Sequence, residues 1–216
     1  MPVVINGTTG ITSPGETVTG NLTVNQSTGG FLTTDGATQT NIQLNTTQAG
    51  SKNWRFTNEG NAGRLRLLGT DGTNTVFPMF VNNGGQITFP AQPAFRVNKS
   101  TTTTAVTEIA WNIENLDTGN NFNTTTGRFT APVAGRYFFS FFGVPQSGGL
   151  INLGLYINGS AGGFWINNGG VNNDTSCSCS ALVELAASDY VSVFLIAGNM
   201  RTSNGDNNGF MGYLIG

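Results

Sequence analysis

The sequence predicts an all-β protein. Apolar and polar residues alternate along many short stretches, which is typical of strands with one buried face. Pairs that favour tight turns, such as Asn-Gly, Asp-Gly and Gly-Gly, recur between these stretches, whereas the 3.6-residue periodicity of an amphipathic helix is nearly absent. We therefore expect sheets whose strands are joined by tight turns.

Residues 1–93 are expected to form a β-rich shaft or attachment segment. They contain short alternating pieces separated by Gly and Asn turns, and only five of the chain's 15 phenylalanines precede Ala94. Because none of these pieces can bury a core alone, they would be stable when three chains wrap or stack around a shared interior. Pro90 and Pro93 mark the end of the segment, since proline interrupts strand pairing and stiffens a linker.

The other ten phenylalanines lie in the C-terminal half, which has enough of them for a substantial core. The run RYFFSFF places Tyr137, Phe139 and Phe141 on one face of a strand and Phe138 and Phe142 on the other. A strand that is apolar on both faces needs two partners. We expect one face to meet a facing sheet and the other a neighbouring subunit, with a loop or the N-terminal segment as the alternative cover.

The stretch LINLGLYIN predicts a strand with one apolar face. Ile151, Leu153, Leu155 and Ile157 share that face, and polar or small residues alternate with them. The pair Asn158-Gly159 follows directly and favours a tight turn with positive φ angles. The stretch therefore predicts one arm of a hairpin.

The two cysteines lie in the stretch TSCSCSALVEL. Alternation places Cys177 and Cys179 on the same face as Ala181, Val183 and Leu185, so we expect reduced, shielded thiols that pack as small hydrophobic groups. A disulfide between them would strain an extended strand. A metal site would need ligands from several chains, because two thiolates without histidine do not complete a tetrahedral shell.

The composition argues against an enzyme. The chain has no histidine, which removes the commonest general base and the commonest zinc ligand together. Glu114 and Asp117 are the acidic residues closest together in the sequence, and we expect them in a solvated loop. We therefore expect no catalytic residues, no metal and no cofactor.

The charge pattern argues against nucleic-acid binding and membrane insertion. Charged residues make up 9% of the chain, are scattered singly and give a net charge of -2, so no basic stripe can neutralise a phosphate backbone. No stretch approaches the ~20 apolar residues of a membrane span. The first 15 residues lack the features of a secretory signal, and release by host lysis, which would fit a virion protein, is one route out of the cell.

Two loops rich in Asn and Gly are candidates for binding, at 167–174 and 203–209. Their oxygen atoms could hold calcium, but turn formation is the simpler explanation, because calcium usually takes more carboxylates than these loops supply. Phe164 and Trp165 follow two glycines and form either an exposed aromatic platform or, as we expect, part of the packed interior.

The stretch from Trp111 to Phe141 resembles the signature of the C1q domain family, the complement and tumour necrosis factor-like domains. Trp111 stands where the family usually has Phe, and the closing stretch FMGYLIG resembles the family's last strand. The resemblance covers Ala94 to Gly216 and implies a two-sheet jelly roll that forms a homotrimer around a threefold axis. The residues that it assigns to the core of the fold and trimer are Trp111, Phe122, Phe129, Gly135, Tyr137, Phe139, Phe141, Phe210 and Gly212.

The N-terminal half is similar to parts of phage tail fibres. The stretch GETVTGNLTVN resembles shaft segments, and the stretch from Lys52 to Phe89 resembles a β-rich module that often precedes fibre tips. No collagen-like Gly-X-Y run is present, which is a departure from the animal members of the C1q family.

These resemblances favour a structural protein of a phage-like virion, a tail fibre or spike. Its N-terminal segment would bind other virion proteins, and its trimeric head would bind a receptor on the host surface, with a glycan as one candidate. The alternative is a cellular, extracellular recognition or adhesion protein of the C1q family, and a glycan depolymerase comes third. We expect receptor binding on loops far from the shaft, because exposed loop residues are not constrained by the core. The candidate residues are Asn172, Asn173, Asp174, Asp206, Asn207 and Asn208.

Overall fold

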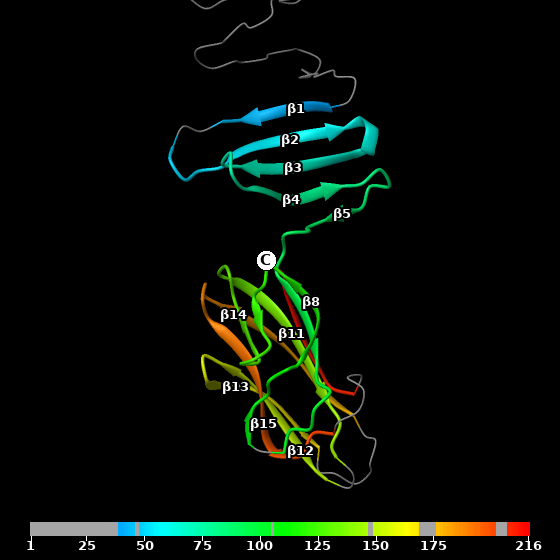
Figure 1. The fold of residues 1–216 in the computed structure, drawn as a ribbon, viewed down its shortest axis with the longest axis vertical. Coiled ribbons are helices and arrows are strands. Elements are labelled where there is room, and N and C mark those ends of the chain that lie inside the picture. Colours follow the sequence, from blue (N-terminus) through cyan, green and yellow to red (C-terminus); the bar gives the residue numbers. More distant parts are fainter. Residues whose placement is uncertain (1–38, 46–47, 105, 147–148, 169–175, 202–206) are drawn as a thin grey trace, which may run out of the picture.

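The computed structural model describes residues 39–216 apart from 46–47, 105, 147–148, 169–175 and 202–206. These residues form a five-stranded N-terminal sheet and a two-sheet jelly roll, with a short linker between them (Figure 1). Apart from one 3₁₀ turn, Gly60–Ala62, every regular element in this part of the chain is a strand, which confirms the all-β prediction.

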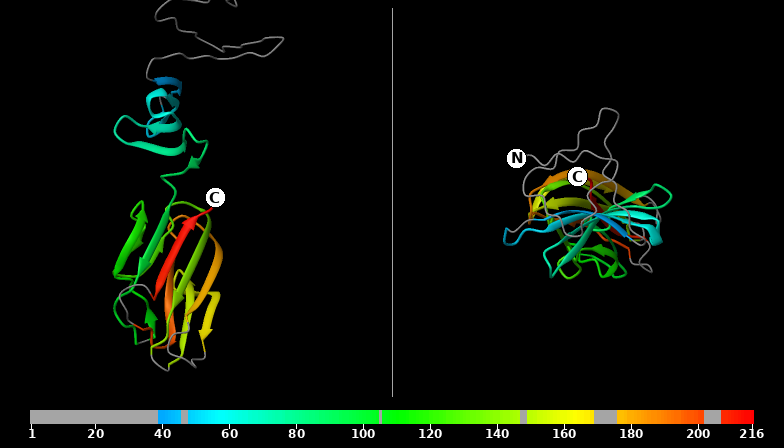
Figure 2. Two further views of the ribbon diagram at one scale, coloured as in Figure 1. Left: turned by 90° about the vertical axis from the view of Figure 1, so that its right-hand side faces the viewer. Right: turned by 90° about the horizontal axis from the view of Figure 1, so that it is seen from above.

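The N-terminal sheet is an antiparallel meander in the order β1-β2-β3-β4-β5. Its strands are β1 (Gln39–Leu44), β2 (Asn53–Glu59), β3 (Arg64–Thr70), β4 (Thr75–Val81) and β5 (Ile87–Thr88). The sheet is a single layer that lies beyond one end of the jelly roll (Figures 1 and 2). A lone layer cannot enclose a core between two sheets, so one of its faces stays open.

The jelly roll consists of two sheets that face each other. The first has the order β14-β11-β16-β6-β8, and the second has the order β13-β12-β15-β10-β9, with β7 (Thr107–Glu108) paired to β15. The strands of the first sheet are β6 (Ala94–Asn98), β8 (Ile113–Thr118), β11 (Gly135–Gly143), β14 (Cys177–Leu185) and β16 (Gly209–Leu214). Those of the second are β9 (Phe122–Asn123), β10 (Arg128–Thr130), β12 (Ile151–Ile157), β13 (Ser160–Asn168) and β15 (Tyr190–Gly198).

The core between the two sheets is built around stacked aromatic rings. Phe95 lies 4.9 Å, centroid to centroid, from both Phe122 and Phe129, and 4.8 Å from the edge-on ring of Phe210. Aromatic pairs at these separations add to the free energy gained from burying their area. Six of the ten phenylalanines of this half are buried in the core, as their concentration in the sequence suggested: Phe95, Phe122, Phe129, Phe139, Phe141 and Phe210.

Strand β12 confirms the expected alternation. Ile151, Leu153 and Leu155 are fully buried, and Ile157 packs against the edge of the same core. Asn158 and Gly159 both have positive φ angles, 51° and 78°, and form the two-residue turn into β13.

The linker, the start of β11 and the C-terminus gather at one end of the jelly roll, which we call the neck end. The Leu214 amide donates to the carbonyl of Pro93 at 3.0 Å, and the Arg136 amide donates to the carbonyl of Gly216 at 2.9 Å. Because the strands run antiparallel, the connections that leave β11, β13 and β15 lie at the opposite end, which we call the far end.

Candidate binding surfaces

The residues that the family resemblance assigned to the core of the fold and trimer lie inside a single subunit. A Cβ atom at Gly212 would lie 2.5 Å from a ring carbon of Phe139, and one at Gly135 would lie 2.8 Å from Leu214 Cδ1, so both glycines are closely packed. The seven aromatic members are buried, namely Trp111, Phe122, Phe129, Tyr137, Phe139, Phe141 and Phe210. These side chains hold the two sheets together, and any surface for a second subunit lies elsewhere.

The outer face of the first jelly-roll sheet is such a surface. Phe138 is half-buried, and its cross-strand neighbours Leu182 and Tyr213 are 57% and 48% exposed. The rings of Phe138 and Tyr213 lie 5.4 Å apart. The three side chains form one row across β14, β11 and β16, which we call the β11 apolar row.

The N-terminal sheet has an apolar face of a similar kind. Strand pairing places Ile42 beside Phe56 and Leu44 beside Trp54. All four side chains are exposed, as are Leu65 and Ile87 on the same face. Soluble proteins seldom leave a continuous apolar face of a sheet in water, so this face needs a cover.

The opposite face of that sheet carries paired charged side chains. Glu59 is buried and pairs with both Arg64 and Arg66. The guanidinium groups of the two arginines lie 4.9 and 5.1 Å from the ring centroids of Phe80 and Phe77. The ion pairs and the ring contacts compensate most of the charge on this face, although Nε of Arg55 and Arg66 is buried without a hydrogen-bond partner among the described residues.

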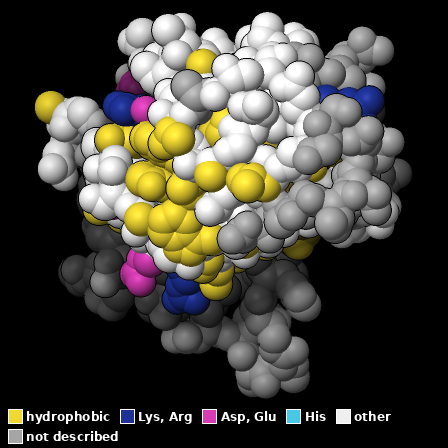
Figure 3. All heavy atoms as spheres, turned by 90° about the horizontal axis from the view of Figure 1, so that it is seen from below, with side chains coloured by type: hydrophobic (Ala, Val, Ile, Leu, Met, Phe, Trp, Pro, Cys, Tyr) yellow, Lys and Arg dark blue, Asp and Glu magenta, His cyan; other side chains and the backbone are white. Residues whose placement is uncertain are grey.

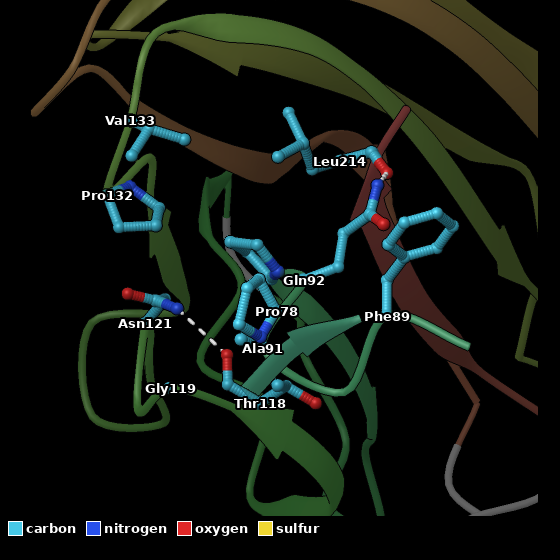
Figure 4. Close-up of a pocket in the computed structure, with 11 residues that line it drawn as sticks. Pro78, Phe89, Ala91, Gln92, Thr118, Gly119, Asn121, Pro132, Val133 and Leu214 are labelled. Carbon is cyan, nitrogen blue, oxygen red and sulfur yellow. Dashed lines mark hydrogen bonds between the residues drawn. The ribbon is translucent and has the colours of Figure 1, made fainter. Parts of the chain in front are cut away.

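A cleft of about 510 Å³ lies at the neck end (Figure 4). In Figure 4 the side chain of Gln92 reaches Leu214, where its amide donates to the main-chain carbonyl, and Asn121 donates to the carbonyl of Thr118 at 2.9 Å. Its lining is mostly apolar and contains no titratable side chain: Pro78, Phe89, Ala91, Gln92, Pro93, Thr118, Gly119, Asn121, Pro132, Val133 and Leu214. The lining offers one hydroxyl group, that of Thr118, and no acidic or basic side chain that could activate it.

The two candidate receptor loops connect strands at the far end. Asn172, Asn173, Asp174 and Asp206 fall outside the residues that the structure describes. The strands that lead into and out of both loops, β13 to β14 and β15 to β16, meet the loops at the end opposite the neck. Seen from that end, hydrophobic side chains gather in one patch, with acidic and basic side chains at two of its edges (Figure 3).

Asn208 was a candidate for the receptor site, but the structure buries it. Its side chain is fully buried, with Oδ1 accepting from the Val144 amide at 3.0 Å and Nδ2 donating to the Arg201 carbonyl at 2.6 Å. Asn98 Nδ2 also donates to the Asn208 carbonyl at 2.9 Å. Asn208 therefore fixes the base of the loop, whereas Asn207 beside it is partly exposed.

The cysteines and the acidic pair Glu114 and Asp117 lie in separate parts of the head. Cys177 and Cys179 are free, half-buried and packed against the core, and burial raises the pKa of the Cys177 thiol. Glu114 and Asp117 lie in strand β8 and not in the expected loop. Asp117 accepts from the main-chain amides of Asn121 and Phe122 at 3.0 and 2.9 Å and so shapes the turn after the strand, while Glu114 is exposed. No group of three or more His, Cys, Asp and Glu residues gathers within the described part of the chain.

Phe164 and Trp165 have different surroundings: one is packed in the interior and the other is exposed. Phe164 packs against the core, as expected, but Trp165 is 47% exposed on the outer face of the second jelly-roll sheet. Its ring lies 6.1 Å from that of Tyr156, edge to face, and Tyr156 stacks on Phe194 at 4.1 Å. We call these three side chains the aromatic platform. Alternation in the sequence places Phe164 and Trp165 on opposite faces, but which of the two is exposed, and the pairing with Tyr156 and Phe194, depend on the strand order.

The fold is a two-sheet jelly roll with open apolar and aromatic faces. Residues 94–215 match the family model of the C1q domain. The chain therefore belongs to the C1q domain family, whose members are generally non-enzymatic recognition modules.

Two solved structures resemble the jelly roll. The globular domain of zebrafish complement 1qA is 25% identical, with a TM-score of 0.44, and the match covers 58% of this chain and 98% of that one. Murine APRIL is 14% identical, with a TM-score of 0.45, and the match covers 57% and 99% of the two chains. No curated protein sequence matches the chain significantly. Within the described residues, no helix is long and apolar enough to cross a membrane.

Proposed function

We propose that the chain is a recognition or adhesion protein that acts outside the cell as a homotrimer. Residues 94–216 would form its binding head, and residues 1–93 would form a shaft that supports the head. The observation that carries the proposal is the β11 apolar row, an open face on a sheet whose other face is already buried in the core. Family membership supports the same assembly, because C1q and tumour necrosis factor-like domains form trimers.

The N-terminal sheet supports the trimer independently. Its exposed apolar residues lie on one face of a single layer, and three such layers around an axis would cover one another. The linker joins this sheet to the neck end of the head, so one threefold axis can serve both parts. Binding would then fall to the sides and the far end of the head, where Asn172 to Asp174 and Asp206 to Asn207 remain our candidates among the loops.

Light scattering on the purified full chain tests the assembly. We expect a mass three times that of the 22.7 kDa chain at micromolar concentration. A monomeric mass would overturn the trimer, and a trimer that adheres to no cell surface would overturn the recognition function while leaving the assembly intact.

A second candidate is a virion fibre or spike in which the N-terminal segment docks on other virion proteins. The observation that favours it is the sheet placed in line beyond the head, in the position where a fibre shaft would continue. Neighbouring genes for virion structural proteins would support this role, and a dedicated export system would support a cellular one. Antibody labelling of assembled particles would distinguish the two directly.

A further inference from the structure

We propose that the aromatic platform on the second jelly-roll sheet binds the neutral sugar rings of a glycan, an inference that rests on the proposed recognition function and gives it a ligand class and a site. Trp165, Tyr156 and Phe194 come from the three adjacent strands β13, β12 and β15. They lie on the outer face, opposite the core, and on a different sheet from the β11 apolar row. Trimer formation through that row would therefore leave the platform open.

Strand register gives the platform a defined shape. Trp165, Gly154 and Phe194 are direct neighbours across β13, β12 and β15, and Glu108 follows Phe194 on β7. With strands about 4.8 Å apart, this row is roughly 14 Å long, enough for more than one sugar ring.

Gly154 leaves the middle of that row without a side chain. A Cβ atom at this position would lie 2.7 Å from Ile196 and 3.0 Å from the Trp165 ring, so the absence of a side chain lets the indole ring lie over the strand. A side chain at residue 154 would displace the ring from the platform.

The polar groups around the rings fit a neutral ligand with hydroxyl groups. Asn152 lies on the same outer face, two residues before Gly154, and its Oδ1 is enclosed without a hydrogen-bond partner in the described part of the chain. A buried acceptor without a donor is costly. Because the carboxamide of the half-buried Asn152 can rotate, its Oδ1 can turn outward and accept from a sugar hydroxyl. At the other end of the row Arg128 makes two 2.8 Å hydrogen bonds to Glu108, so these two charges neutralise each other.

The size of the platform favours a small ligand over a protein. Aromatic side chains bury about 150–250 Å² each when they are covered completely. Three rings that are already partly packed fall well short of the ~800 Å² that each side of a stable protein interface buries. A sugar ring, with an apolar C–H face and hydroxyl groups at its edge, matches exposed rings beside an unpaired acceptor.

A glycan array probed with the full chain tests the inference. The array carries neutral oligosaccharides of glucose, galactose and N-acetylglucosamine together with sialylated and sulfated forms. We expect binding to neutral glycans, and a roughly tenfold or greater loss of affinity in Trp165→Ala and in Tyr156→Ala. Val133→Ala removes an exposed apolar side chain at the neck end and should bind as the wild type does.

The outcomes separate the inference from the function on which it rests. Light scattering and thermal unfolding on each variant identify any loss that comes from misfolding, and Trp165→Phe, which keeps an aromatic face, should retain part of the affinity. If correctly folded Trp165→Ala binds glycans like the wild type, the platform is not the site. If the wild type adheres to cells but binds no neutral glycan, the proposed ligand class is wrong and the proposed recognition function is retained. If it binds neither cells nor glycans, the proposed function itself fails.

Discussion

At the scale of single residues, the buried amide of Asn208 shows how one side chain can hold a loop in place. It joins Val144 and Arg201, which follow β11 and β15, and its main-chain carbonyl accepts from Asn98 at the end of β6. Three connections at the far end therefore meet at one residue. This position is structural, although its sequence context of Asn and Gly suggested an exposed receptor loop.

We expect Asn208→Ala to destabilise the head. The change leaves the Val144 amide and the Arg201 carbonyl without their partner, at about 1–3 kcal/mol for each buried group. Chemical denaturation should show the loss, and Asn199→Ala, at an exposed position nearby, should change the free energy of unfolding little. Equal stability of the two variants would mean that water replaces the amide and that the loop base is open.

The thiol of Cys177 gives a second test at this scale. Because burial raises the pKa of this thiol, its reactive thiolate is scarce at neutral pH and appears only at higher pH than in a free cysteine. We expect slow alkylation of the native protein and rapid alkylation of both cysteines after denaturation, measured by mass spectrometry. Rapid labelling of both thiols in the native state at pH 7 would show that this end of β14 is open to solvent.

At the scale of elements, β11 was the most informative stretch in the sequence and β13 the least. Alternation in RYFFSFF placed Tyr137, Phe139 and Phe141 in the core and left Phe138 on the outer face, because a strand's period of two fixes which side chains share a face. In β13 the same alternation separates Phe164 from Trp165 but does not reveal which face is buried. That depends on the pairing of Trp165 with Gly154, and thus on the strand order, which a single sequence does not contain.

We expect Phe138→Glu in β11 to dissociate the trimer without unfolding the subunit. The substitution places a charge among Leu182 and Tyr213, where a neighbouring subunit would have to remove it from water. Light scattering should report a mass near 22.7 kDa for this variant and a trimer for Thr130→Glu, which places the same charge at an exposed position on the other sheet. A trimeric Phe138→Glu protein with native circular dichroism would exclude the β11 apolar row as the interface.

At the scale of the whole molecule, the chain combines a complete head with an incomplete sheet. The head buries a large aromatic core between two layers. In the N-terminal sheet, charged groups on one face pair with one another, and the apolar side chains of the other face are exposed. Sequence composition predicted this contrast through the uneven distribution of phenylalanine. It did not predict that residues 39–88 form a regular meander, because the pairing of five short strands depends on turns that many Gly- and Asn-rich sequences could make.

The contrast predicts different behaviour on dilution. Residues 94–216 expressed alone should fold as the head, and their trimer should dissociate at higher concentration than that of the full chain, because the truncated protein lacks the contacts of the N-terminal sheets. Mass photometry over a dilution series measures the dissociation constants of both trimers. If the two proteins dissociate at the same concentration, the apolar face of the N-terminal sheet contributes nothing to assembly and must have another cover.

The meeting of linker and C-terminus at the neck determines how the protein can be attached to a support. The last residues are tied back by the bonds from Leu214 to Pro93 and from Arg136 to Gly216. A tag or surface anchor added after Gly216 would therefore hold the head with its far end outward, in the orientation that the N-terminal segment also imposes. Immobilisation through the C-terminus would thus leave the far-end candidate loops free, and a bulky fusion partner placed there would crowd the N-terminal sheet.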